Sequence, residues 1–213
     1  ADESQTKELV YSVEYFRDGT LIPADTQTVV GNVQVLQPNM LPVDATNINT
    51  TDKYLGYKLD YIAVDGKRVD ALPTEGSSTI RVYYTLDEAQ TKELSYTVEY
   101  YRQNQLVAED TQRTATTVQI LQPDVLGVDA SSINTTDKYL GYALESVRVN
   151  GQPVDALPAT VPDGSTITVN YIVDPTQTKQ LTYKVEFTRD GEFVTEDTFN
   201  FNTTVHVTES DML

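Results

Sequence analysis

The stretch "LVYSVEYFRDG", from Leu9 to Gly19, alternates two kinds of side chain and ends in a turn signal. Leucine, tyrosine and valine stand at every second position, with valine, serine and glutamate between them. Period two is typical of a β-strand with one face in a core and the other in water. Aspartate followed by glycine permits the positive φ angles of a tight hairpin turn. The sequence therefore predicts a half-buried strand that turns back on itself at Asp18-Gly19.

The same pattern returns twice, as "LSYTVEYY" from Leu94 and as "LTYKVEFT" from Leu181. Sliding the chain by 85 positions aligns residues 5–74 with residues 90–159 without a gap, and 41 of the 70 pairs are identical. A third copy begins at Gln177 and reaches the middle of a module at Leu213. A repeat of this length can close a small core of its own.

We therefore expect a mainly β chain (α+β at most) of tandem modules in an elongated array. Module one covers residues 5–88, module two covers residues 89–175, and residues 176–213 form the N-terminal half of a third, truncated module. Three explanations of the half module stay open: its parent chain continues, another chain completes its sheet, or it packs back on module two. A two-stranded hairpin alone is only marginally stable. We favour the first explanation, because Leu213 falls mid-module, in register with Leu126.

Alternation also predicts which side chains are buried. The last strand, "STIRVYY", repeats the pattern of the first. The predicted core of module one consists of Leu9, Tyr11, Val13, Tyr15, Ile80 and Val82, and module two has the same set 85 to 87 positions later. Asp44 and Asp129 are each placed to cap a short helix.

The longest identity is "INTTDKYLGY", at Ile48–Tyr57 and again at Ile133–Tyr142. A structural interpretation is favoured over a ligand loop displayed twice. The tyrosines would fill the core, Gly56 would let the backbone bend, and the Asn, Thr and Asp side chains would bond to local backbone.

These motifs resemble a known family. "YSVEYFRDGTLIPADTQTV", the Gly-Tyr before the third strand and "STIRVYY" are similar to the mucin-binding-protein (MucBP) and internalin B-type tandem repeats of Gram-positive cell-wall adhesins. Streptococcal high-identity repeat domains are similar too. The resemblance implies β-grasp (ubiquitin-like) modules, with the first and last strands adjacent in a mixed sheet. "VQVLQP" and "INTTDKYLGY" lie outside the pattern, so mucin affinity is not carried over with the fold.

The amino-acid composition argues against several classes of function. The net charge of −17 opposes binding to nucleic acid or to anionic lipid. There is no cysteine, and no apolar run approaches membrane-spanning length. The sequence offers few candidates for a catalytic base. Its one histidine, His206, occupies a strand position that is held by Gln34 and Gln119 in the other copies. We expect a non-enzymatic protein without membrane insertion and an exposed strand position for His206.

No cofactor is expected. Two chemical features stay open, a calcium site and an isopeptide bond. Calcium could bind oxygen ligands in the acidic loop of Asp44, Asn47, Asn49 and Asp52, although a solvated surface is the favoured interpretation. In adhesin stalks of this kind a lysine–asparagine isopeptide bond can join the first and last strands. Module two offers the residues Lys92, Glu99 and Asn170, whereas module one has Tyr83 in place of the asparagine.

The expected function is a stalk segment of an extracellular, wall-anchored adhesin, a monomeric rod that projects a distal binding region. Short junctions support it: "DEAQ" at Asp87–Gln90 and "DPTQ" at Asp174–Gln177. The alternative is a module that itself binds mucin, a host glycoprotein or another glycan. Its contacts would be exposed aromatics such as Tyr83 and Tyr101.

Overall fold

The computed structural model describes residues 4–212, apart from the side chain at position 196. Every regular element in that range is a β-strand or a single turn of 3₁₀ helix. The mainly β expectation is therefore confirmed. None of the described helices has the length and apolar content needed to cross a lipid bilayer.

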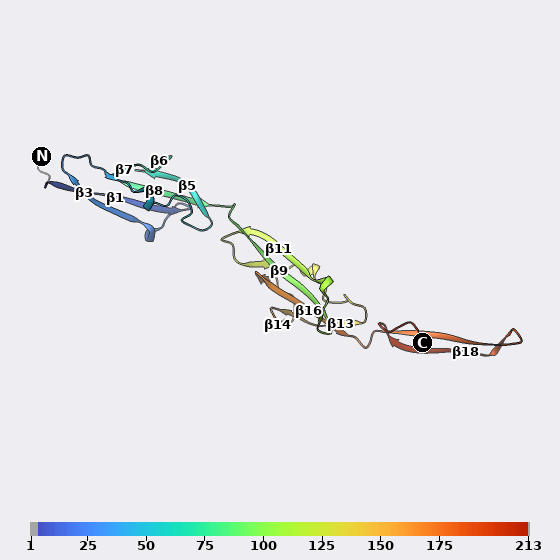
Figure 1. Cartoon of the computed structure of the whole chain (residues 1–213). Helices are drawn as coiled ribbons and strands as arrows, with labels where there is room; N and C mark the ends of the chain where they lie inside the picture. The colour runs from blue at the N-terminus through green and yellow to red at the C-terminus, as the bar shows by residue number, and fades with distance from the viewer. Residues whose placement is uncertain (1–3, 213) are drawn as a thin grey trace. The chain divides into compact units, whose positions relative to one another are not determined.

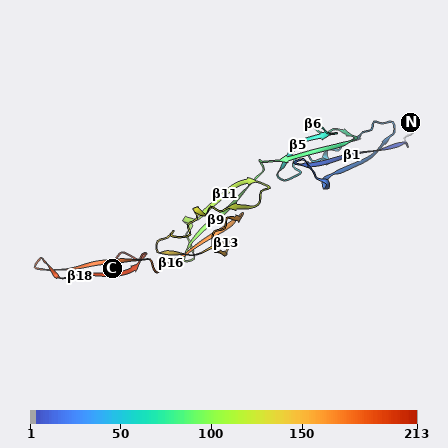
Figure 2. The ribbon, with the colours of Figure 1, turned by 180° about the vertical axis from the view of Figure 1, so that it is seen from behind.

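The first repeat contains eight strands and two 3₁₀ turns. In chain order they are β1 (Thr6–Arg17), β2 (Thr20–Leu21), η1 (Pro23–Asp25), β3 (Gln27–Gln34), β4 (Leu41–Pro42), η2 (Ala45–Asn47), β5 (Tyr57–Val64), β6 (Lys67–Val69), β7 (Glu75–Gly76) and β8 (Thr79–Leu86). The larger sheet has the order β2-β1-β8-β5-β6, and β3 pairs with β1 as well. Figures 1 and 2 show these strands from two sides.

The first and last long strands of this repeat, β1 and β8, run parallel to each other, and their neighbours run antiparallel. The mixed sheet with adjacent first and last strands is the arrangement that the family resemblance implied. Residues 41–56 cross over one face of the sheet, and β4 pairs with β7 there.

The second repeat has the same order of elements. They are β9 (Thr91–Arg102), β10 (Gln105–Leu106), η3 (Ala108–Asp110), β11 (Gln112–Gln119), β12 (Val125–Gly127), η4 (Ala130–Ser132), β13 (Tyr142–Val149), β14 (Gln152–Val154), β15 (Thr160–Pro162) and β16 (Ser165–Val173). Its sheet, β10-β9-β16-β13-β14 with β11 on β9, matches the first strand for strand. The hairpin of β17 (Thr178–Arg189) and β18 (Glu192–His206) follows.

The described chain forms two compact units. The first unit extends to Lys92 and also includes Thr117–Gln122, and the second consists of Glu93–Thr116 and the residues from Pro123 on. The module boundaries drawn from the repeat stay a prediction.

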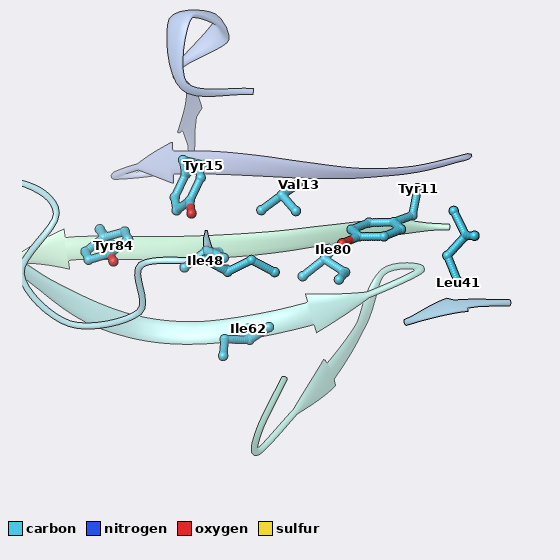
Figure 3. Close-up of a cluster of buried hydrophobic side chains, with 9 residues drawn as sticks. Tyr11, Val13, Tyr15, Leu41, Ile48, Ile62, Ile80 and Tyr84 are labelled. Atoms are coloured by element: carbon cyan, nitrogen blue, oxygen red, sulfur yellow. The ribbon is translucent and has the colours of Figure 1, made fainter. Parts of the chain in front are cut away.

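The core of the first repeat lies between the sheet and the crossover segment. Figure 3 shows its buried side chains, namely Tyr11, Val13 and Tyr15 of β1, Ile80 and Tyr84 of β8, Ile62 of β5, and Leu41 and Ile48 of the crossover. The predicted core is buried in both repeats with one exception. Leu9 is half-buried, whereas its counterpart Leu94 is 1 % exposed. In the longer loop of the second repeat, Asp163 accepts from the amide of Ser95 and the amide of Gly164 donates to the Ser95 carbonyl, directly beside Leu94.

Buried tyrosines hold the crossover by hydrogen bonds. The hydroxyl of Tyr15 accepts from the amide of Asn49 at 3.1 Å, and the hydroxyl of Tyr84 donates to the Asn49 carbonyl at 2.9 Å. The second repeat makes the same pair of bonds to Asn134. Burial raises the pKa of Tyr84 to about 12, so its hydroxyl stays a donor. The side chain of Asn49 takes part as well, because its Oδ1 accepts from the Tyr84 hydroxyl at 3.3 Å and from the Thr51 amide at 2.9 Å.

The short helix expected after Asp44 is the single turn η2. The Asp44 carboxylate accepts from the amide of Thr46 at 2.9 Å and so caps that turn. At the first hairpin of the second repeat Gln103 and Asn104 stand where the first repeat has Asp18 and Gly19. Both take positive φ, 50° and 62°, and keep the two-residue turn of the first repeat.

Candidate functional site

Tyr101 and Asn170, two of the residues identified from the sequence, are neighbours in the second sheet. Tyr101 lies on β9 and Asn170 on β16, and the parallel ladder pairs them directly. Both point away from the core, because the adjacent Tyr100 and Val169 are completely buried in it. The outer face of the second sheet is therefore a candidate binding surface.

Asn170 is the centre of a polar network on this face. Its side-chain amide donates to Asn104 Oδ1 at 2.9 Å and to the carboxylate of Glu145. Asn170 is 7 % exposed, and its Oδ1 is a buried acceptor with no hydrogen-bond partner within the described part of the chain. Leaving such a group unsatisfied costs about 1–3 kcal/mol.

A pocket of about 410 Å³ lies beside this network. It is lined by Tyr101, Asn104, Glu145, Arg148, Thr168 and Asn170. The lining combines one aromatic ring with an anion, a cation, a hydroxyl and two amides. Several polar groups around one ring suit a ligand that is rich in hydroxyls, since each can orient part of such a ligand.

Glu99 also belongs to this face. The hydroxyl of Tyr101 donates to Glu99 Oε2 at 3.0 Å. That hydrogen bond, with a smaller contribution from burial, raises the pKa of Tyr101. The ring is thereby held in one orientation by a carboxylate of its own strand.

The first repeat has an aromatic row at the equivalent place. Phe16, Tyr83 and Tyr61 stack across β1, β8 and β5, with ring centroids 4.7 Å and 4.3 Å apart. The Arg68 guanidinium lies 4.5 Å from the centroid of Tyr61. Phe16 and Tyr61 both stack on the Tyr83 ring, which is half-buried. Tyr83 and Tyr101 lie on different sheets.

The isopeptide residues are not brought together. Lys92 stands near the start of β9, and its Nζ donates to the carbonyl of Gln122 at 2.5 Å. Asn170 is paired with Tyr101, near the other end of β9. Glu99 bonds to Tyr101 rather than to either of them. An isopeptide bond stays a prediction that an intact mass can test through the loss of ammonia.

In the acidic loop that was considered as a calcium site, the carboxylates accept hydrogen bonds from other residues of the same loop. Asp44 accepts from Thr46 and from the side chain of Asn47. Asp52 accepts from Thr51 at 2.9 Å, and that hydrogen bond lowers the pKa of Asp52. Among the side chains that the structure describes, no three of His, Cys, Asp or Glu gather as a metal-binding group.

A second feature, not foreseen from the sequence, is built on Gly56. This glycine has φ +80°, and its amide donates to Gln90 Oε1 at 3.0 Å. The side-chain amide of Gln90 donates in turn to the carbonyl of Tyr57 at 3.1 Å and to Asp87 at 3.2 Å. Gln90 thus ties the start of one repeat to the "LGY" turn of the repeat before it.

The segment Thr117–Gln122, which belongs to the same compact unit, closes over this turn. Gln119 donates to the Asp87 carbonyl at 3.3 Å, and Ile120 donates to the Gln90 carbonyl at 2.9 Å. A Cβ placed on Gly56 would lie 2.5 Å from Leu121 Cγ, so only glycine leaves room for that leucine. We call Gly56, Asp87, Gln90, Gln119 and Leu121 the Gly56 joint.

The second unit repeats the arrangement around Gly141, which has φ +84°. Its amide donates to Gln177 Oε1 at 2.9 Å, and a Cβ on it would meet Thr208 at 2.6 Å. His206 takes the place of Gln119: its Nε2 lies 2.9 Å from the carbonyl of Asp174. The exposed position expected for His206 is wrong, because the ring is half-buried in this joint.

One sequence signal, not used in the sequence analysis, could have indicated the joints. Glutamine opens every copy in "QTK", at a position just before the first strand where alternation places no core residue. Only the tertiary structure identifies its partner, a turn 34 to 36 positions earlier.

Comparison with known proteins gives a limited result. No family model and no curated protein matches the chain. Two solved structures are similar: the type 2 repeat of the mucus binding protein MUB from Lactobacillus reuteri and the structure of Mub-RV. Their sequences are 17 % and 18 % identical to this one, and each match covers 78 % of this chain and 100 % of the other, with TM-scores of 0.26 and 0.23. Likenesses at these TM-scores carry no argument about function, which has to be argued from the residues of this chain.

Proposed function

We propose that this chain is a stalk segment of a bacterial cell-surface adhesin, and that it holds a distal binding region away from the cell wall. The observation that carries the proposal is the Gly56 joint. The connection Asp87–Gln90 is a hydrogen-bonded turn rather than a free linker. A stalk needs connections that resist bending, because a flexible linker would let successive repeats fold back on one another.

The two repeats also support a spacer role. Their buried tyrosines and crossovers are equivalent, while their outer faces differ: an aromatic row in one and a polar pocket in the other. Because the repeats share their core but not their outer face, the property that they have in common is the length that each adds to the chain. The proposal places the chain outside the cell, anchored to the wall of a Gram-positive bacterium, as a monomeric rod without enzymatic activity.

Small-angle scattering tests the stalk. The intact chain should have a maximum dimension close to that of end-to-end repeats. Insertion of a Gly-Ser linker after Asp87 should broaden the distance distribution toward shorter values. If both proteins give the same broad distribution, the junction does not act as a stiff connection and the stalk proposal fails.

A second candidate function, recognition of a glycan, is favoured by the Asn170 pocket. A saccharide would meet the Tyr101 ring with its C–H face and the groups around Asn170 with its hydroxyls. The name of the solved MUB repeat says that its parent protein binds mucus, which is in keeping with this candidate.

A glycan array probed with the intact chain tests this candidate. A stalk without ligand should bind nothing. A glycan-binding module should lose retention in Tyr101→Ala, while its melting curve stays unchanged. The matched control is Val125→Ala, an exposed side chain on β12 that is not part of the pocket lining.

A further inference from the structure

The loop that seals the Gly56 joint has a counterpart in the first repeat. In the second repeat this front loop is Gln119–Pro123, and in the first repeat it is Gln34–Pro38. Gln119 Oε1 accepts from the amide of Leu121 at 2.7 Å, and Gln34 Oε1 accepts from the amide of Leu36 at 2.7 Å. The two loops are therefore held in the same local conformation.

A lysine fastens each front loop in the same way. Lys7 Nζ donates to the carbonyl of Gln37 at 2.5 Å, and Lys92 Nζ donates to the carbonyl of Gln122 at 2.5 Å. In the third copy Lys179 donates to the carbonyl of Glu209. The loop of the first repeat is thus already built in the shape that the other loops have in their joints.

The two loops differ in the solvent exposure of the leucine at their centre, Leu36 or Leu121. Leu121 packs against Gly56 and is 46 % exposed, whereas Leu36 is 79 % exposed. The position equivalent to Leu121 in the third copy is Thr208, which lies against Gly141. Two of the three front loops are therefore docked on a "YLGY" turn, and the third presents its leucine to solvent.

We propose that the front loop of the first repeat, Gln34–Pro38, is a docking surface whose partner is the "YLGY" turn of a further copy of the same repeat. The occupant is specified by the two joints in the structure. A glycine with positive φ leaves space for the leucine tip, and its amide and the following carbonyl bond to the glutamine of "QTK". This inference rests on the proposed stalk function, because only repeats joined in series bring such a turn to the loop.

Thiol labelling tests the docking, since the chain has no cysteine of its own. Leu36→Cys is made in the 213-residue chain and in an extended chain with a second copy of residues 5–89 placed directly before Gln5. The reaction rate of the introduced thiol should fall several-fold in the extended chain, to the rate measured for Leu121→Cys in the original chain. Gly56→Val in the added copy should restore fast labelling.

An unchanged labelling rate in the extended chain would overturn the inference. It would leave the stalk proposal intact if scattering still shows repeats arranged end to end, so the two failures can be told apart.

A pair of variants in the original chain covers the case in which the extended chain does not fold. Leu121→Asp should shift the urea midpoint of the first unit downward, and Leu36→Asp should leave it in place. Equal midpoints would mean that a docked leucine adds nothing, and the inference would be wrong.

Discussion

A comparison of Gly56→Ala with Gly66→Ala measures how much the Gly56 joint contributes to stability, apart from the cost of placing a side chain at a positive φ. Gly56 has φ +80° and faces Leu121, whereas Gly66 has φ +77° and a Cβ added to it would meet no atom within 4 Å. A side chain in the left-handed region costs about 1–2 kcal/mol at either position. Only Gly56→Ala also displaces Leu121.

The additional loss can be worked out from exposure. Docking lowers the exposed fraction of the leucine from 79 % at Leu36 to 46 % at Leu121, about a third of the side chain. Full burial of a leucine contributes about 1.5–3 kcal/mol, so a third contributes about 0.5–1 kcal/mol. Gly56→Ala should therefore lower the free energy of unfolding by that much more than Gly66→Ala.

Urea denaturation of the two variants, followed by tyrosine fluorescence, measures the difference, provided that the m-values agree. Equal losses for Gly56→Ala and Gly66→Ala would refute the reasoning. The docked leucine would then be an incidental contact, and the glycine would be required by its backbone angle alone.

Single side chains give three further predictions. Ile80→Ala should destabilise the first repeat by about 2–5 kcal/mol in denaturant, because Ile80 is completely buried; a loss below about 1 kcal/mol would contradict the assigned core. The hydroxyl of Tyr54 donates a hydrogen bond to Asp25. This hydrogen bond is the largest of the causes that lower the pKa of Asp25. A lowered folded-state pKa stabilises the protein above the unfolded value of about 3.9 and loses that effect as the pH falls through the folded pKa. Tyr54→Phe should thus cost stability at pH 7 and much less at pH 2, and a pH-independent cost would exclude this bond as the cause. His206→Gln should keep hydrogen-exchange protection of the Gly141 amide and His206→Ala should reduce it, whereas equal protection in both would show that the ring does not support the joint.

Much of this fold could be predicted from the sequence, because its signals are local. Alternation in "YSVEYF" places Tyr11, Val13 and Tyr15 on one face whatever the strand pairs with. Asp65-Gly66 specifies a two-residue turn through its own backbone angles, which are positive at both residues. The repeat of 85 residues then carries the same strands and core into the second module.

The candidate site was predictable only in part. Tyr101, Glu99 and Asn170 were identified as residue types at strand positions, and the structure joins them on one face. Tyr83 looked equally available, but Phe16 and Tyr61 both stack on its ring, which is half-buried. Strand order decides which side chains become neighbours across a sheet, and alternation along one strand carries no information about it.

The joints depended most on tertiary structure. Nothing local distinguishes Gln90 from any polar residue before a strand, or Leu121 from Leu36. Their roles arise because the chain returns Gln90 and Leu121 to the same turn from positions 34 and 65 residues beyond Gly56. The sequence by itself determined the strands, the turns and the core of each repeat through short-range periodicity; the contacts between distant segments, which make the joints and the Asn170 pocket, were decided by how the folded sheets bring those segments together.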